Sequence, residues 1–153
     1  MKKLSYLLLT TLFVLSYSCS KDDDPEEFPT YKFKIDLEFS GDYLDYKFKF
    51  TAGGSAQGPE PFKNTNTGEQ ANTLTSDITE SSYQFESVNE LVSFTSGVSS
   101  NTNTENLENA FLSIKIYRDN KLFHEENITF IADGSGGVSW AYVNGELIRT
   151  PKL

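Results

Sequence analysis

His124 is the one histidine of the chain, and it stands directly before Glu125 and Glu126. A histidine that acts as a general base needs an orienting carboxylate and a nucleophile within reach. Neighbouring residues of a strand point to opposite faces, and no serine stands in a Gly-x-Ser-x-Gly motif. We therefore expect an exposed strand histidine and assign no catalytic residue.

Carboxylates are plentiful, with 22 Asp and Glu residues, and their number alone is compatible with the carboxylate pair of a glycosidase. No pair stands out by its spacing. Asp22-Asp23-Asp24 lacks the glycine and the distal glutamate of a calcium loop. Residues 133–137, Asp-Gly-Ser-Gly-Gly, are compatible with a calcium or phosphate site, but a plain hairpin turn explains them better. One cysteine and one histidine cannot form a zinc cluster, so we expect no metal and no cofactor.

Trp140 and Tyr142 stand two residues apart in an apolar segment and therefore share one face of a strand. If that face meets solvent, the two rings form a stacking platform for a sugar, and they are the candidate ligand-binding residues of the chain. If it faces inward, they are core, which the usual burial of aromatic residues favours.

Residues 1–18 combine a basic start, Lys2 and Lys3, with an apolar run over residues 7–15. This run is shorter than the roughly 20 apolar residues that span a bilayer, and a secretory signal needs only roughly 7–15. We predict a signal peptide over residues 1–18.

The segment Leu15-Ser16-Tyr17-Ser18 before Cys19 resembles the lipobox of bacterial lipoproteins, in which a cysteine receives acyl chains such as palmitate. Leu15 stands four residues before the cysteine, where the pattern has three. Ordinary cleavage after Ser18 is the alternative, because Ser16 and Ser18 form a small-x-small site. A lone thiol at a secreted N-terminus would be reactive without an evident use, which favours lipidation of Cys19.

Residues 19–29 form a polar, acidic segment that cannot fold alone. It resembles the start of lipoproteins of the Bacteroidota, where an acidic cluster accompanies export to the outer leaflet; a plain solvated tether is the alternative. We expect an anchor in the outer membrane and exposure at the cell surface. Without residues 1–18 the chain has 11 basic and 22 acidic residues, an excess that repels nucleic-acid phosphates. We therefore expect no nucleic-acid partner.

Two alternating stretches follow, residues 31–39 and 44–50, in which apolar residues alternate with charged ones. That period of two is typical of a half-buried strand. The short Gly-containing break between them predicts an antiparallel hairpin, with Leu44 in the core beside its aromatic neighbours.

The remainder has no helical period, and residues 52–72 predict a long loop. Asp119-Asn120 and Asn144-Gly145 supply turn residues that tolerate positive φ. Shorter patterns predict strands near residues 83–85, 91–98, 112–117, 122–123, 128–131, 138–143 and 146–148. Seven or eight short strands over residues 30–153 predict one all-β domain, an immunoglobulin-like antiparallel sandwich, with a small barrel as the alternative.

Three stretches resemble the β-sandwich domains grouped with the MmpS family and related small Bacteroidota lipoproteins: residues 35–48, residues 85–99 and residues 113–122. In the last, Asn120 stands where the family has a glycine. The Pro-Trp pair common before the middle strands is absent, and Ser81-Ser82 stand there. The resemblance implies an accessory or structural role at the membrane and transfers no catalytic residue.

These observations together predict a non-enzymatic lipoprotein of the cell envelope, a structural or accessory interaction domain held at the membrane by its lipid. Its expected partners are the membrane and an envelope protein or a glycan. The alternative is a glycan-binding module of the cell surface, and an envelope hydrolase is least supported.

Overall fold

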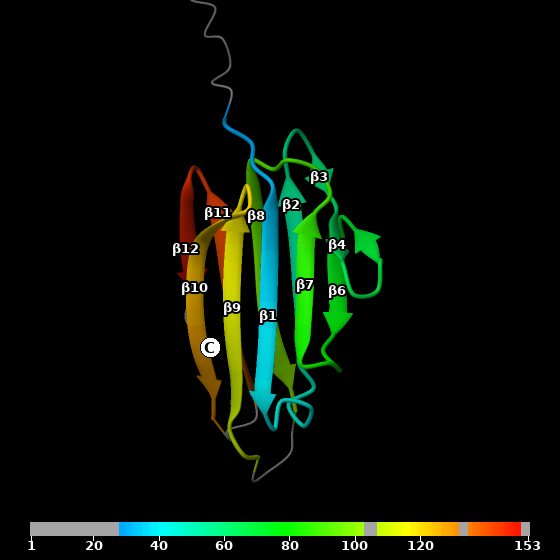
Figure 1. Cartoon of the computed structure of the whole chain (residues 1–153), viewed down its shortest axis with the longest axis vertical. Coiled ribbons are helices and arrows are strands. Elements are labelled where there is room, and N and C mark those ends of the chain that lie inside the picture. The colour runs from blue at the N-terminus through cyan, green and yellow to red at the C-terminus, as the bar shows by residue number, and fades with distance from the viewer. Residues whose placement is uncertain (1–27, 103–106, 132–134, 151–153) are drawn as a thin grey trace, which may run out of the picture.

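The computed structural model describes residues 28–102, 107–131 and 135–150, and all regular structure within them is β-strand (Figure 1). The strands are β1 (Phe33–Gly41), β2 (Lys49–Ser55), β3 (Pro59–Glu60), β4 (Phe62–Asn64), β5 (Gln70–Ala71), β6 (Thr73–Asp77), β7 (Ser82–Ser87), β8 (Ser93–Asn101), β9 (Ala110–Arg118), β10 (Lys121–Phe130), β11 (Ser135–Val143) and β12 (Glu146–Thr150). No helix in these ranges is long and apolar enough to cross a membrane.

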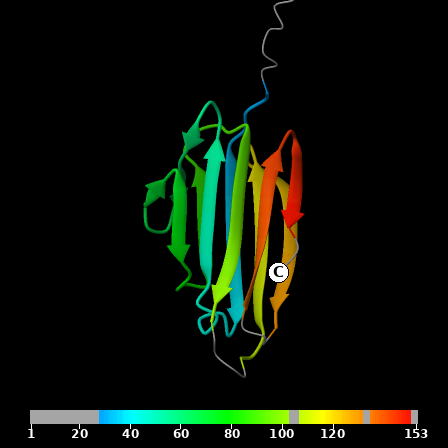
Figure 2. The ribbon, with the colours of Figure 1, turned by 180° about the vertical axis from the view of Figure 1, so that it is seen from behind.

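The strands form two antiparallel sheets that pack face to face. Sheet I has the order β10-β9-β1-β7-β4-β5 and is the front layer of Figure 1. Sheet II has the order β12-β11-β8-β2-β3, with β6 also paired to β2, and is the front layer of Figure 2. Within the described ranges the pairing gives two separate sheets, so the fold is a sandwich, as the alternation predicts, and the twelve strands found there exceed the seven or eight expected.

The core lies between the sheets and is rich in aromatic rings, because alternate residues of each strand point inward. Phe50 of β2 stacks on Phe85 of β7 across the two sheets, with ring centroids 4.0 Å apart and both side chains fully buried. Phe33 of sheet I also contacts Phe94 and Tyr142 of sheet II, in tilted arrangements with ring centroids 4.7 and 4.8 Å apart. The inward positions of both sheets therefore form one shared core.

The prediction that residues 31–50 form an antiparallel hairpin is wrong. β1 pairs with β7 and β9 in sheet I, whereas β2 pairs with β8, β6 and β3 in sheet II. Residues 42–48 cross between the sheets, and Leu44 is 56% exposed, although Tyr46 and Phe48 are buried as predicted. The Tyr46 hydroxyl donates to the carbonyls of Glu108 and Phe130, at 2.9 and 3.1 Å, and so anchors this connection.

The prediction of a long loop over residues 52–72 is also wrong, since this segment contains the end of β2 and all of β3, β4 and β5. Its turn at residues 64–68 depends on the buried Asn64. The Asn64 carboxamide oxygen accepts from the backbone N–H groups of Asn66 and Thr67, at 2.9 and 3.4 Å. Its Nδ2 donates to Ser76 Oγ at 3.3 Å. A polar side chain thus shapes strands that hydrophobic periodicity does not reveal.

The two later turns are confirmed. Asp119 and Asn120 have φ of 50° and 63°, and Asn144 and Gly145 have φ of 53° and 88°. Positive φ at both central residues suits the twist of a two-residue hairpin. The first turn joins β9 to β10, which is one strand of ten residues with a register shift between Leu122 and His124, where two separate pieces were expected. The second turn joins β11 to β12.

Candidate functional site

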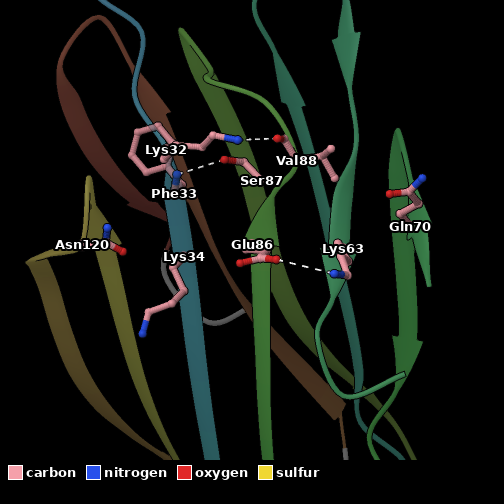
Figure 3. Close-up of a pocket in the computed structure, with 9 residues that line it drawn as sticks. All are labelled: Lys32, Phe33, Lys34, Lys63, Gln70, Glu86, Ser87, Val88 and Asn120. Atoms are coloured by element: carbon pink, nitrogen blue, oxygen red, sulfur yellow. Dashed lines mark hydrogen bonds and ion pairs between the residues drawn. The ribbon is translucent and has the colours of Figure 1, made fainter. Parts of the chain in front are cut away.

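A depression of about 400 Å³ lies on the outer face of sheet I, near the end at which β1 begins (Figure 3). Its lining comes from β1 and the residue before it, from β4 and β5, from β7 and the residue after it, and from the β9–β10 turn: Lys32, Phe33, Lys34, Lys63, Gln70, Glu86, Ser87, Val88 and Asn120. Segments far apart in the sequence therefore meet here, and we take this depression as the candidate site.

The strand register aligns four outward side chains across the floor of the depression. Lys34 of β1 is the partner of Glu86 of β7, which is in turn the partner of Lys63 of β4, and Lys63 is the partner of Gln70 of β5. Lys34, Glu86 and Lys63 lie on the outer face because their strand neighbours are buried, and the exposed Gln70 is aligned with Lys63 at the edge of the sheet. Glu86 consequently stands between two lysines.

Lys32 connects the walls of the depression. Its backbone N–H donates to Asp119 Oδ1 at 2.9 Å, and its carbonyl accepts from the Asp119 N–H at 2.9 Å. These two bonds hold the β9–β10 turn against β1 and place Asn120 at the rim. The Lys32 ammonium donates to the Val88 carbonyl and so links the residue before β1 to the residue after β7 (Figure 3).

The lining is positively charged, with three lysines against one carboxylate. Lys63 Nζ lies 3.8 Å from Glu86 Oε1. Lys34 Nζ lies 3.2 Å from Asp36 Oδ2 and 4.1 Å from the centre of the Tyr117 ring, turned away from Glu86. Ammonium donors, two amides and one carboxylate suit the binding of a small polar ligand.

Trp140 and Tyr142 were candidate ligand-binding residues on the condition that their shared strand face meets solvent, and it does not. Both are 1% exposed and point into the core. Trp140 Nε1 donates to Glu126 Oε2 at 3.3 Å, and the Tyr142 hydroxyl accepts from Arg118 Nη1 at 3.3 Å. Neither ring offers a face to a sugar, so the stacking platform is excluded and the core interpretation holds.

His124 is half-buried rather than exposed, and it faces the inner side of β10. Its Nε2 lies 3.4 Å from Glu126 Oε2, while Glu126 Oε1 lies 2.6 Å from Arg149 Nε of β12. Glu126 thus links an edge strand of sheet I to the edge of sheet II. Glu125 points to the other face, as expected, and pairs with Lys115 at 3.5 Å.

Within the described ranges, no three His, Cys, Asp or Glu side chains group so as to hold a metal ion. The signal peptide over residues 1–18, the lipidation site Cys19 and Asp133 of the 133–137 run lie outside the described residues.

Sequence reasoning missed the depression because Lys63 and Gln70 fall in the segment interpreted as a loop. One sequence pattern did point to part of its lining. Lys32 and Lys34 alternate with Tyr31 and Phe33, which predicts two lysines on one outer face. Their partners across the sheet could not be identified without the strand order.

No protein-family model matches the chain, and no curated protein matches it. Solved structures with a similar fold include a domain of unknown function, DUF4425, from Bacteroides vulgatus, with a TM-score of 0.62 and 20% identity over 82% of this chain and 99% of that one. A DUF4425 family protein from Bacteroides ovatus has a TM-score of 0.59 and 22% identity, over 74% and 96%.

The calcium-bound form of a protein from Parabacteroides distasonis, determined by NMR, has a TM-score of 0.61 and 12% identity, over 86% of this chain and 100% of that one. At such identities the likeness concerns the fold alone. The chain is an all-β sandwich similar in fold to DUF4425 proteins.

Proposed function

We propose that this chain is a non-enzymatic lipoprotein of the bacterial cell envelope, which presents its β-sandwich as a binding domain at the outer membrane. The observation that carries the proposal is an order in the sequence: a basic start and an apolar run within residues 1–18, then Cys19, a polar and acidic segment to residue 29, and the sandwich domain. Multiple acyl chains on Cys19 give the stable membrane hold that one chain cannot.

The position of the first strand is compatible with display on a tether. Tyr31 pairs with Leu91 through two backbone hydrogen bonds, of 3.0 and 2.8 Å, directly before β1. Residues 28–32 enter at the end that carries the β9–β10 and β11–β12 turns, and residues 42–48 lie at the opposite end (Figure 1). A tether attached at one end leaves the outer faces of both sheets accessible to a partner.

The test is fractionation of cells that express Cys19→Ala, with Ser20→Ala as the matched control. We expect Cys19→Ala to leave the membrane pellet and to lose labelling by an alkyne-bearing palmitate, because it has no site for the acyl chains. Ser20→Ala should stay in the pellet and be labelled. Retention of Cys19→Ala in the pellet would show that lipid on this residue is not the anchor.

Calcium binding is a second candidate, favoured by the calcium-bound form of the Parabacteroides distasonis protein. A ligand that binds only the folded state at 100 times its Kd adds about 2.7 kcal/mol of stability. A calcium site therefore predicts a melting temperature several degrees higher in CaCl2 than in EDTA, with MgCl2 as the control. Equal melting in all three solutions would remove this candidate.

A further inference from the structure

We propose that the depression on the outer face of sheet I binds an acidic sugar, one that carries a carboxylate as well as free hydroxyl groups. This goes beyond the envelope role proposed above and does not depend on the lipid anchor. The inference begins from charge. The whole chain has a formal charge of −9, yet Lys32, Lys34 and Lys63 line one depression that contains a single carboxylate.

The lysines keep hydrogen-bonding capacity for a ligand. An ammonium has three N–H donors. The 3.8 Å separation between Lys63 Nζ and Glu86 is longer than a hydrogen bond, so a ligand carboxylate can approach this ammonium more closely. Lys34 is 29% exposed at its side chain and can turn from Asp36 toward the depression by rotation of its flexible stem.

The other polar groups distinguish a sugar from a bare anion. Glu86 stands in the middle of the floor and would repel any anionic group placed beside it, so a ligand carboxylate must lie toward the lysines. The Glu86 oxygens accept hydrogen bonds from hydroxyl groups, which a bare phosphate or sulfate dianion does not offer. Asn120 lies on one side of it and Gln70 on the other (Figure 3), and an amide both donates to and accepts from hydroxyls. Lysine donors, one carboxylate acceptor and two amides together match a uronic acid.

The size and the rigidity of the depression fit this class of ligand. Its volume of about 400 Å³ lies at the small end of ligand pockets, which span roughly 300–1,000 Å³. Glu86, Lys63 and Gln70 stand on paired strands, and the Asp119–Lys32 bonds fix the turn that carries Asn120, whereas the Lys34 ammonium must leave Asp36 and the Tyr117 ring to reach a ligand. Groups on rigid strands are positioned before the ligand arrives.

The experiment is calorimetric titration of the purified full-length protein, in nonionic detergent, with digalacturonate. Neutral digalactose, which has hydroxymethyl groups in place of the carboxylates, is the control ligand. The variants are Lys63→Gln, Glu86→Ala and Lys115→Gln. Lys115 is the matched control, because it lies on the same outer face, pairs with Glu125 and is 37% exposed against 41% for Lys63, yet is outside the depression.

We expect saturable binding of digalacturonate and none of digalactose. Lys63→Gln should weaken binding about tenfold through loss of one charged donor. Glu86→Ala should weaken it as well through loss of the hydroxyl acceptor, and Lys115→Gln should change it less than about twofold. Circular dichroism melts check that each variant is folded. Any of the following results would overturn the proposal: no saturation by digalacturonate, equal binding of digalactose, or equal weakening by Lys115→Gln and Lys63→Gln. Tighter binding by Glu86→Ala would reject the sugar and leave a plain anion site.

Discussion

The outer faces of the two sheets differ sharply, although their inner faces form one core. On sheet I, charges alternate across the strands, as in the row Glu125–Lys115–Asp36–Gln84. On sheet II the matching rows contain uncharged residues, which are small apart from the exposed Ile148: Thr150–Ser139–Gly97–Thr51–Thr75 and Ile148–Ala141–Thr95–Gly53–Thr73. The ion pair of Lys49 with Asp77 lies at the end of this face.

The same contrast holds between two depressions, the candidate site on sheet I and one on sheet II. A depression of about 310 Å³ on sheet II is lined by Thr51, Gly97, Val98, Ser99, Gly137, Val138, Ser139 and Thr150, without a charged group. This depression exists because Gly97 and Gly137 have no side chains to fill the outer surface between the strands. The depression on sheet I is instead bordered by long lysines. Burial therefore requires apolar residues on the inner faces of both sheets. The outer residues are free of this requirement, and their types differ between the two sheets.

The largest effects should come from the shared core, where the two sheets are equivalent. Phe85→Ala in sheet I and Phe50→Ala in sheet II should each lower the free energy of unfolding by about 3–5 kcal/mol. The rings stack on each other, so the double variant should lose less than the sum of the two single losses. Urea unfolding of the three variants measures this. Additive losses would indicate that the sheets do not share one core at this point.

A smaller effect is expected from added volume on the outer faces. A Cβ at Gly97 would lie 3.1 Å from both Ser139 Cβ and the Val138 carbonyl oxygen. Gly97→Val on sheet II should therefore cost about 1–3 kcal/mol of stability through overpacking. Ser113→Val on sheet I, where a side chain already stands outward, should change it by less than about 0.5 kcal/mol. Thermal melts compare the two, and equal costs would contradict the difference in packing.

The smallest effect should come from charge. Lys115→Glu places a third carboxylate between its strand partners Asp36 and Glu125, which should cost about 0.2–1 kcal/mol and be partly relieved by 1 M NaCl. Thr51→Glu on sheet II has Gly97 and Thr75 as partners and should show little dependence on salt. Matched salt responses of the two variants would argue against paired charges on sheet I.

The sequence was most informative where structure is local. The turns at Asp119-Asn120 and Asn144-Gly145 were predicted, because their φ values depend on residues that tolerate the left-handed region. The alternation in residues 31–39 and 112–117 correctly identified the inward residues of β1 and β9. The MmpS resemblance and lipidation of Cys19 stay predictions.

Strand partners were the main failure. The alternation of residues 31–39 and 44–50 is the same whether the strands form a hairpin or lie in opposite sheets, since both arrangements bury one face of each strand. Leu44 was misplaced for that reason. Short strands such as β4 and β5 have too few residues for a period, and Asn64, rather than hydrophobic pattern, shapes their turn.

By itself, the sequence determined the all-β class, the inward and outward residues of the long strands and the two tight turns, because period and φ preference act over a few residues. Tertiary structure alone decided that Lys34, Glu86, Lys63 and Gln70 stand in one row, since these come from four strands aligned only by long-range pairing. It also decided between the two interpretations of Trp140. Parity placed Trp140 and Tyr142 on one face, but only the packing of sheet I over sheet II made that face the core.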